Sequence, residues 1–297
     1  MLTVVSAIDK AENEFMSIQS IQQLLFPKSM GKKRPNKLVT FVKKSWSSYQ
    51  KLKEAHEISY HFSQFLAPVV ANSDYKKHCV YGLRHNVYCE ELNFEPVKED
   101  KQETDEFDSF SEYCLIQHVH SEAFAGTVRV VSPMKEDELL PIEKYCLNTI
   151  TDQEFSPTNF KRTEICEISR LAVPAAFRRR KADKHIGAAT GAINKYIYSE
   201  TELRCFPFIA VGLYFSAAAL AIKLNKKHAF VMMEPRLAKS MGFVGIKFKQ
   251  IGPVVDYHGK RAPYYINADL LYSNLTKGFK VMLENIQEHI NRQNISE

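Results

Sequence analysis

The chain has 297 residues, of which 45% are apolar, so it can bury a substantial core in one large domain. Its first residues, MLTVVSAIDKAENEF, lack the basic start and the apolar run of a secretory signal, and we expect a cytoplasmic protein. The six cysteines are scattered without a CxxC pair or a nearby histidine cluster, which predicts reduced thiols and no metal site.

The net charge of +6 is concentrated in residues 28–44 and in the run RRRKADK at 178–184. Clustered positive charge favours an acidic partner. No helix-turn-helix pattern, aromatic RNA-binding signature or zinc finger accompanies this charge, so we expect no nucleic-acid binding.

The Lys- and Ser-rich residues 1–55 predict an N-terminal extension that is partly mobile. A compact domain over 56–268 is expected to begin with a helix at 56–70. A second helix follows Asn72-Ser73-Asp74 and ends near Glu91.

Three strands are predicted at 113–121, 124–133 and 163–173, with a short helix at LPIEKY between the last two. Further elements are expected in chain order: a helix at 208–224, a strand at 228–234, a short helix at 235–243, and strands within 247–257 and 262–268. The apolar segment 205–222 approaches the length of a membrane span, but Pro207 and Gly212 interrupt it and favour a buried helix. This order predicts one mixed sheet with helices around it.

Residues 269–297 are predicted to form one C-terminal amphipathic helix that packs on the domain or on a partner. Its apolar face carries Leu271, Leu275, Phe279, Met282, Leu283, Ile286 and Ile290. The acidic residues Glu284 and Glu288 argue against a membrane-surface helix, although a peripheral membrane contact stays open. The oligomeric state is not predicted.

The segment CEISRLAV, residues 166–173, has the pattern of a buried strand but contains Glu167, Ser169 and Arg170. A buried charge is costly unless it is paired. The strand therefore either lies at a solvated edge or lines a cleft where these side chains do chemistry.

Other polar and aromatic residues precede this strand in the following order: Arg84, Tyr88, Phe94, Asp105, Asp108 and Arg129. Each alone has a structural explanation, such as an exposed helix pair or a solvated acidic loop. Together with Glu167-Ile168-Ser169-Arg170, they resemble the pattern of the acyl-homoserine-lactone (autoinducer) synthases and their relatives, the N-acyl amino acid synthases. The sequence departs from that pattern in having Phe94 where autoinducer synthases have Trp, and in a longer connection between Arg129 and Glu167.

Whole phrases from about residue 75 to 266 resemble the PEP-CTERM/exosortase system-associated acyltransferases of bacteria. They are VYCEELNFEP, DEFDSFS, GTVRVVSP, LPIE, EISRLAVPAAFRRR, MMEPRLA and QIGPVVDYHGKRAPYYI. The resemblance implies an α+β, GNAT-like acyl-CoA N-acyltransferase fold, in which a splayed mixed sheet is flanked by helices.

In that fold the strand CEISRLAV borders a gap in the sheet where an acyl thioester lies. Glu167 and Ser169 share a strand face, whereas Arg170 points oppositely unless a β-bulge near 169–171 turns it, and we predict such a bulge. Glu167, Ser169 and Arg170 are the expected catalytic residues, with Glu167 as the base. The six residues that precede the strand are expected to bind the acceptor, the Asp pair attracting an ammonium group and an arginine binding a carboxylate.

The donor is expected to contact the exposed main chain of Leu171, Ala172 and Val173 and the basic residues Arg178, Arg179 and Arg180, with the 208–224 helix and the MMEP strand lining an acyl pocket. The resemblance to the autoinducer synthases favours acyl carrier protein as the partner. CoA is the other source of acyl thioester, and no permanently bound cofactor is expected. The expected reaction joins a fatty-acyl group to the amine of an amino acid or similar small molecule. An acyl-homoserine-lactone synthase that uses S-adenosylmethionine and a non-catalytic acyl-binding module stay open as alternatives.

Overall fold

The computed structural model describes residues 59–177, 208–257 and 259–295. Contacts divide the chain into residues 1–48 and 49–297, and all described residues lie in the second unit. The predicted extension at 1–55 and the basic residues Arg178, Arg179 and Arg180 lie outside the described residues.

The described part of this unit is built on one mixed sheet with strand order β1-β2-β3-β4-β5-β8-β6, in which β7 also pairs with β8. Only the pairing of β4 with β5 is parallel. The strands are β1 (Leu66–Val70), β2 (Ser111–His118), β3 (Phe124–Val131), β4 (Ile165–Ala172), β5 (His228–Met233), β6 (Lys249–Gln250), β7 (Val255–Asp256) and β8 (Lys260–Ile266).

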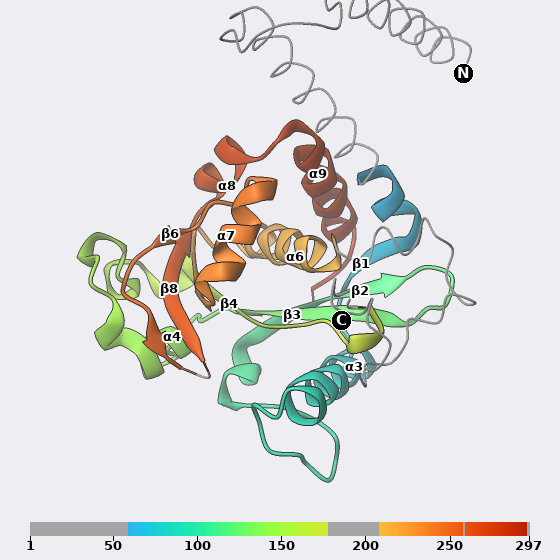
Figure 1. Cartoon of the computed structure of the whole chain (residues 1–297), viewed down its shortest axis with the longest axis horizontal. Coiled ribbons are helices and arrows are strands. Elements are labelled where there is room, and N and C mark those ends of the chain that lie inside the picture. The colour runs from blue at the N-terminus through green and yellow to red at the C-terminus, as the bar shows by residue number, and fades with distance from the viewer. Residues whose placement is uncertain (1–58, 178–207, 258, 296–297) are drawn as a thin grey trace, which may run out of the picture. The chain divides into compact units, whose positions relative to one another are not determined.

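Helices cover both faces of the sheet (Figure 1). One face carries α6 (Ile209–Lys223), α7 (Pro235–Val244), α8 (Ala268–Asn274) and α9 (Lys277–Asn291). The other carries α3 (Asp74–His85), its π-helical continuation η1 (Asn86–Glu91) and α4 (Pro141–Cys146). Short 3-10 turns complete the fold: η2 (Glu106–Phe110), η3 (Leu147–Thr149), η4 (Gln153–Phe155), η5 (Pro157–Asn159), η6 (Arg162–Glu164) and η7 (Ala175–Phe177).

The main core lies between the sheet and α6, which is buried around almost its whole circumference. This burial explains why its sequence is apolar on every side. The prediction of a buried helix here is confirmed, and no helix in the described residues is long and apolar enough to cross a membrane.

The prediction of one helix over 56–70 was wrong, because residues 59–65 are helical but Leu66–Val70 is the edge strand β1. Pro68 explains the difference, since proline removes a hydrogen bond from a helix interior but is tolerated at a sheet edge. The outer side of β1 is covered by Gln293, whose side chain accepts from the Val70 N–H at 2.8 Å and donates to the Pro68 carbonyl at 2.9 Å.

The C-terminal segment forms two helices, α8 and α9, where one was predicted. Leu275 and Thr276 between them have extended backbone, and Thr276 precedes the first turn of α9. All seven residues of the predicted apolar face are buried in the main core.

Candidate active site

Strands β4 and β5 diverge after a short parallel pairing. Their register runs from Ile165 opposite His228 to Glu167 opposite Phe230, and then stops. However, β4 continues to Ala172 and β5 to Met233. Beyond Glu167, therefore, the side of β4 that faces β5 has no strand partner among the described residues, and its backbone groups can bind a ligand.

The predicted β-bulge is present in β4. Arg129 of β3 lies opposite Ser169 and Thr127 lies opposite Ala172, so two residue steps on β3 match three on β4. The extra residue falls at Arg170, whose φ is 49°. This left-handed conformation breaks the alternation of the strand and lets the Arg170 side chain reach acids near those of Arg129.

Arg84 anchors a buried charge network from α3. Its side chain is fully buried, its Nε lies 2.5 Å from Glu103, and its two Nη atoms donate to Asp108 at 2.7 and 3.1 Å. Burial alone would raise the pKa of Asp108, but hydrogen bonds and charge from Arg84, with the charge of Arg129, hold that pKa well below its usual range. Asp108 is therefore a carboxylate at any physiological pH.

The predicted strand arginine joins the same network. Arg129 is only 1% exposed. Its Nη1 contacts Asp105 at 2.5 Å and Asp108 at 3.0 Å, and its Nε donates to the Ser169 hydroxyl at 3.0 Å. The Ser169 hydroxyl proton has no acceptor among the described residues and is free to donate to a ligand.

Arg170 completes the network. It lies 3.2 Å from each of three carboxylates, those of Glu95, Glu103 and Asp105. Sequence reasoning missed Glu95 and Glu103, which lie in an acidic, irregular connection between η1 and η2. The only sequence signal for these two residues is the high density of acids around DEFD, and a solvated loop would show the same density.

The two predicted aromatic residues differ in burial. The Tyr88 hydroxyl donates to the Leu171 carbonyl at 2.8 Å, next to the bulge, and the Arg170 guanidinium lies 5.6 Å from its ring centroid. Tyr88 thus links η1 to the unpaired part of β4. Phe94, in contrast, is 41% exposed and lies at the rim of the cavity described next.

A cavity lies where the strands diverge. It brings together six of the predicted residues: Tyr88, Phe94, Arg129, Glu167, Ser169 and Arg170. Arg84, Asp105 and Asp108 do not line it: the two aspartates hold its arginines, and Arg84 in turn holds Asp108. Leu171 and Ala172 continue β4 and Val173 follows the strand, but none of the three lines the cavity. Sequence reasoning missed Glu95, Pro141, Met232, Tyr257 and Arg261, which also line the cavity.

Glu167 is the buried acid of this cavity, with 2% of its surface exposed. Its Oε2 accepts the Ile142 N–H from the start of α4 at 2.7 Å. Burial raises the pKa of Glu167 to about 8, and this effect outweighs the Ile142 hydrogen bond and the charge of Arg129, which act in the opposite direction. A carboxyl group with such a pKa can exchange protons near neutral pH, as a general base must.

Within the described residues, no group of three or more His, Cys, Asp and Glu side chains has the arrangement of a metal site. Glu95 in the cavity lining, and Glu103, Asp105 and Asp108 behind it, are instead paired with arginines, whereas Glu167 is not paired with any described arginine. The arrangement can bind polar groups, accept a proton at Glu167, and donate hydrogen bonds from Ser169 and from unpaired backbone.

Among solved structures, TofI in a ternary complex with an inhibitor and MTA aligns at 14% identity with a TM-score of 0.48, over 68% of this chain and 91% of TofI. FeeM, an N-acyl amino acid synthase from uncultured soil microbes, aligns at 12% identity with a TM-score of 0.47, over 71% of this chain and 94% of FeeM. BjaI, a CoA-dependent acyl-homoserine lactone synthase, aligns at 13% identity with a TM-score of 0.47, over 78% of this chain and 92% of BjaI. No curated protein sequence matches the chain.

A family model gives the remaining comparison. Residues 83–187 match the acetyltransferase (GNAT) domain, a range that begins in α3 and includes β2, β3 and β4. It therefore contains the charge network, the bulge and Glu167. With this match and a mixed sheet that opens between β4 and β5, the chain has an α+β, GNAT-like acyltransferase fold.

Proposed function

We propose that the protein is an N-acyltransferase that moves a fatty-acyl group from a thioester to the amine of an amino acid or similar small molecule. The observation that carries this proposal is the opening between β4 and β5, with the bulge at Arg170 and the buried Glu167 at its border. A thioester can lie along the unpaired backbone there, with its carbonyl near the hydrogen-bond donors of the cavity.

The reaction joins the amine nitrogen to the thioester carbonyl carbon and breaks the carbon–sulfur bond. The ammonium group of the acceptor first loses a proton to the Glu167 carboxylate, so that a nitrogen lone pair is available. The tetrahedral intermediate carries a negative oxygen, which the Ser169 hydroxyl and free backbone N–H groups can stabilise. When the intermediate collapses, the nitrogen loses a second proton and the thiolate leaves and is protonated to a thiol.

The charge network supports this chemistry from behind the cavity. Arg129 holds the Ser169 hydroxyl by donating to its oxygen, which leaves the hydroxyl proton for the substrate. Asp105 and Asp108 fix Arg129, and Glu103 and Glu95 fix Arg170. These residues hold the cavity wall in position. Because each of them is paired with an opposite charge, the free-energy cost of burying charge there is lower.

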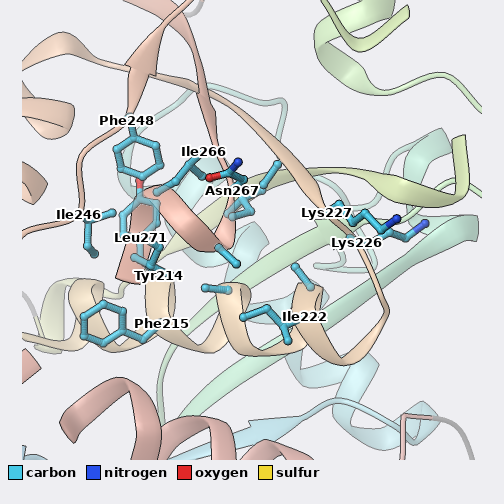
Figure 2. A pocket seen from close by; sticks show the side chains of 15 residues that line it. Tyr214, Phe215, Ile222, Lys226, Lys227, Ile246, Phe248, Ile266, Asn267 and Leu271 are labelled. Atoms are coloured by element: carbon cyan, nitrogen blue, oxygen red, sulfur yellow. The ribbon is translucent and has the colours of Figure 1, made fainter. Parts of the chain in front are cut away.

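We propose that the acyl chain enters a second, apolar cavity on the opposite face of the sheet. Figure 2 shows this cavity between α6 and the segment that includes Ile266, Asn267 and Leu271. Its side chains include Tyr214 and Phe215, and the ammonium groups of Lys226 and Lys227 point away from them (Figure 2).

Ile168 connects the two cavities, because it lines the apolar one and follows Glu167 directly on β4. Successive strand residues point to opposite faces. An acyl chain whose carbonyl lies near Glu167 can therefore pass between β4 and β5 into the apolar cavity.

The resemblance to the autoinducer synthases supports acyl carrier protein as the donor, with CoA as the alternative. Either donor carries the same phosphopantetheine arm and thioester. The basic residues Arg178, Arg179 and Arg180, proposed to bind the donor, follow the described part of β4 and η7 directly in the sequence.

Mass spectrometry of lipid extracts from bacteria that express the full chain tests the proposed function. We expect new N-acyl species with the wild type, whose head group identifies the acceptor, and none with Glu167→Gln. Glu112→Gln is the matched control, because burial also raises the pKa of Glu112 but it lies on β2, outside the cavity lining. If no N-acyl species appears, or if Glu167→Gln produces it as well as the wild type, the proposal is wrong and a non-catalytic acyl-binding module becomes the better account.

A further inference from the structure

Arg261 of β8 differs from the other arginines of the active-site cavity. Of the three arginines that line it in the described part of the chain, Arg129 and Arg170 are each held by two or more carboxylates. The side chain of Arg261 makes neither a hydrogen bond nor an ion pair with any described residue, and its Nε is buried without a partner. A partly buried guanidinium without an anion is costly, so this position favours an anionic ligand.

The strand register places Arg261 across the opening from the bulge. Met232 of β5 lies opposite Pro263, and by the alternation of the strand Arg261 shares a sheet face with Pro263 and Tyr265. Tyr265 packs with Ile165 in the core on the face that Glu167 occupies. Arg261 therefore faces the cavity from the β5 and β8 side, while Ser169 and Arg170 face it from β4.

The charges within the cavity leave Arg261 unbalanced. Glu95 is taken by Arg170. Burial favours the neutral form of Glu167, whose pKa is about 8. Burial also raises the pKa of Tyr88, which lines the same cavity, and the positive charges of Arg170 and Arg261 oppose this effect. A ligand that brings one negative charge would balance the cavity.

We propose that Arg261 binds the carboxylate of the acceptor, so that the acceptor is an amine that carries a free carboxylate, as an α-amino acid does. This proposal rests on the function proposed above. The planar guanidinium can hold both carboxylate oxygens, while the amine of the same molecule is directed to Glu167. It differs from the expectation that an arginine of the buried network binds this carboxylate, because Arg84, Arg129 and Arg170 are already paired with carboxylates.

Isothermal titration calorimetry on the full chain, with the proteinogenic amino acids and their carboxamides as probes, tests this proposal. A carboxamide keeps the amine and the side chain but removes the negative charge. We expect the best-binding amino acid to bind roughly 10- to 150-fold more tightly than its carboxamide, the range of one charged hydrogen-bonded contact. In Arg261→Met that preference should disappear, and in Arg261→Lys a part of it should remain.

Lys260→Met is the matched control, because Lys260 is the exposed neighbour of Arg261 on β8 and points to the other face. It should keep the full preference. Thermal melting of each variant identifies any loss of binding that comes from unfolding, and Arg261→Lys tests the contact if Arg261→Met does not fold.

Three results would overturn the proposal. The first is an undiminished preference for the acid over the carboxamide in Arg261→Met, and the second is no binding of any free amino acid to the wild type. The third is a loss of CoA binding in Arg261→Met with the acid preference unchanged, which would assign Arg261 to a donor phosphate. If amino acids bind through Arg261 but no amine is ever acylated, the proposed function fails while this inference stands.

Discussion

At the residue scale, the site depends on arginines that are buried deeply. Arg84 and Arg129 are among the largest fully buried side chains of the described residues. Neither would be stable there alone, because removing a guanidinium from water costs several kcal/mol unless hydrogen bonds and opposite charge compensate it. Asp108 provides this compensation for both, since it contacts Arg84 at 2.7 Å and Arg129 at 3.0 Å.

Replacing Asp108 by Asn should cost about 3–5 kcal/mol of unfolding free energy at pH 7, because two buried arginines lose a carboxylate. The pKa of Asp108 is lowered in the folded state. Its contribution to stability is therefore complete above the ordinary aspartate pKa of 3.8 and is lost as pH falls through the lower folded value. Urea unfolding at several pH values should show that Asp108→Asn is less stable at neutral pH but loses less stability in acid. The exposed Asp137→Asn is the control, and equal stability of both variants at pH 7 would contradict the account.

Glu167 predicts the pH dependence of the reaction. Its pKa of about 8 means that the base form increases with pH and is dominant only above that value. We expect kcat/KM to rise with pH and to level off above about 8, and Glu167→Gln to lose this rise together with most of the activity. An acceptor whose amine has a different pKa should shift only the part of the pH profile that depends on deprotonation of the amine, and not the part that depends on Glu167. A rate that does not change between pH 6 and 9 would exclude Glu167 as the base.

The same pKa shift has the opposite sign for stability. Because the folded-state pKa lies above the ordinary value of 4.5, folding favours the protonated form. The contribution of Glu167 to stability is therefore greatest below about 4.5 and declines as pH rises to about 8. The burial that would suit Glu167 to act as a base thus lowers the stability of the protein at neutral pH.

At the scale of elements, the bulge in β4 determines where Arg170 points. A regular strand would direct Arg170 away from Ser169, toward the main core, where no acid would meet it. The left-handed backbone at φ 49° instead leads its guanidinium to Glu95, Glu103 and Asp105.

Two substitutions at this position test the backbone conformation. Arg170→Ala and Arg170→Gly both remove the ion pairs, but only in the alanine variant does the left-handed backbone carry a steric cost, about 1–2 kcal/mol. We therefore expect Arg170→Gly to be more stable than Arg170→Ala by roughly 1 kcal/mol in chemical denaturation, with both variants poorly active. If alanine is the more stable of the two, the strand does not have this bulge.

The sequence predicted the elements that carry a local pattern, and the E-x-S-R segment is the clearest example. Alternation indicated β4, and the conflict between its period and its polar residues indicated the bulge. Arg261 and Tyr257 could not be found in this way, because the pairing of β7 with β8 is far along the chain from β4, and Arg261 lies on β8 while Tyr257 directly follows β7. Pro68 did carry a local signal for an edge strand, but the apolar run around it favours helix and strand equally.

At the scale of the whole described unit, the two cavities lie on opposite faces of one sheet and meet at the same opening. Glu167 lines the polar cavity and Ile168 lines the apolar one. In the proposed reaction, the sheet would therefore separate the acceptor amine from the fatty chain, and only the thioester would lie between β4 and β5.

Filling the apolar cavity should change the acyl chain that is accepted and leave the acceptor unchanged. Ala218 of α6 lines this cavity and is small. Ala218→Val and Ala218→Phe should shift the N-acyl products stepwise to shorter chains with the same head group, as measured by mass spectrometry. Overpacking of this kind costs about 1–3 kcal/mol, so melting temperatures should accompany the product analysis. Unchanged chain lengths in Ala218→Phe would place the acyl chain elsewhere.

The most direct measurement is a crystal structure of the full chain with a non-hydrolysable acyl-pantetheine thioether. The account predicts that the pantetheine lies along β4 beyond Glu167, with its sulfur beside Glu167 and Ser169 and its acyl chain past Ile168 toward Tyr214. A ligand bound outside the opening, or an opening between β4 and β5 that remains empty at saturating ligand, would contradict it.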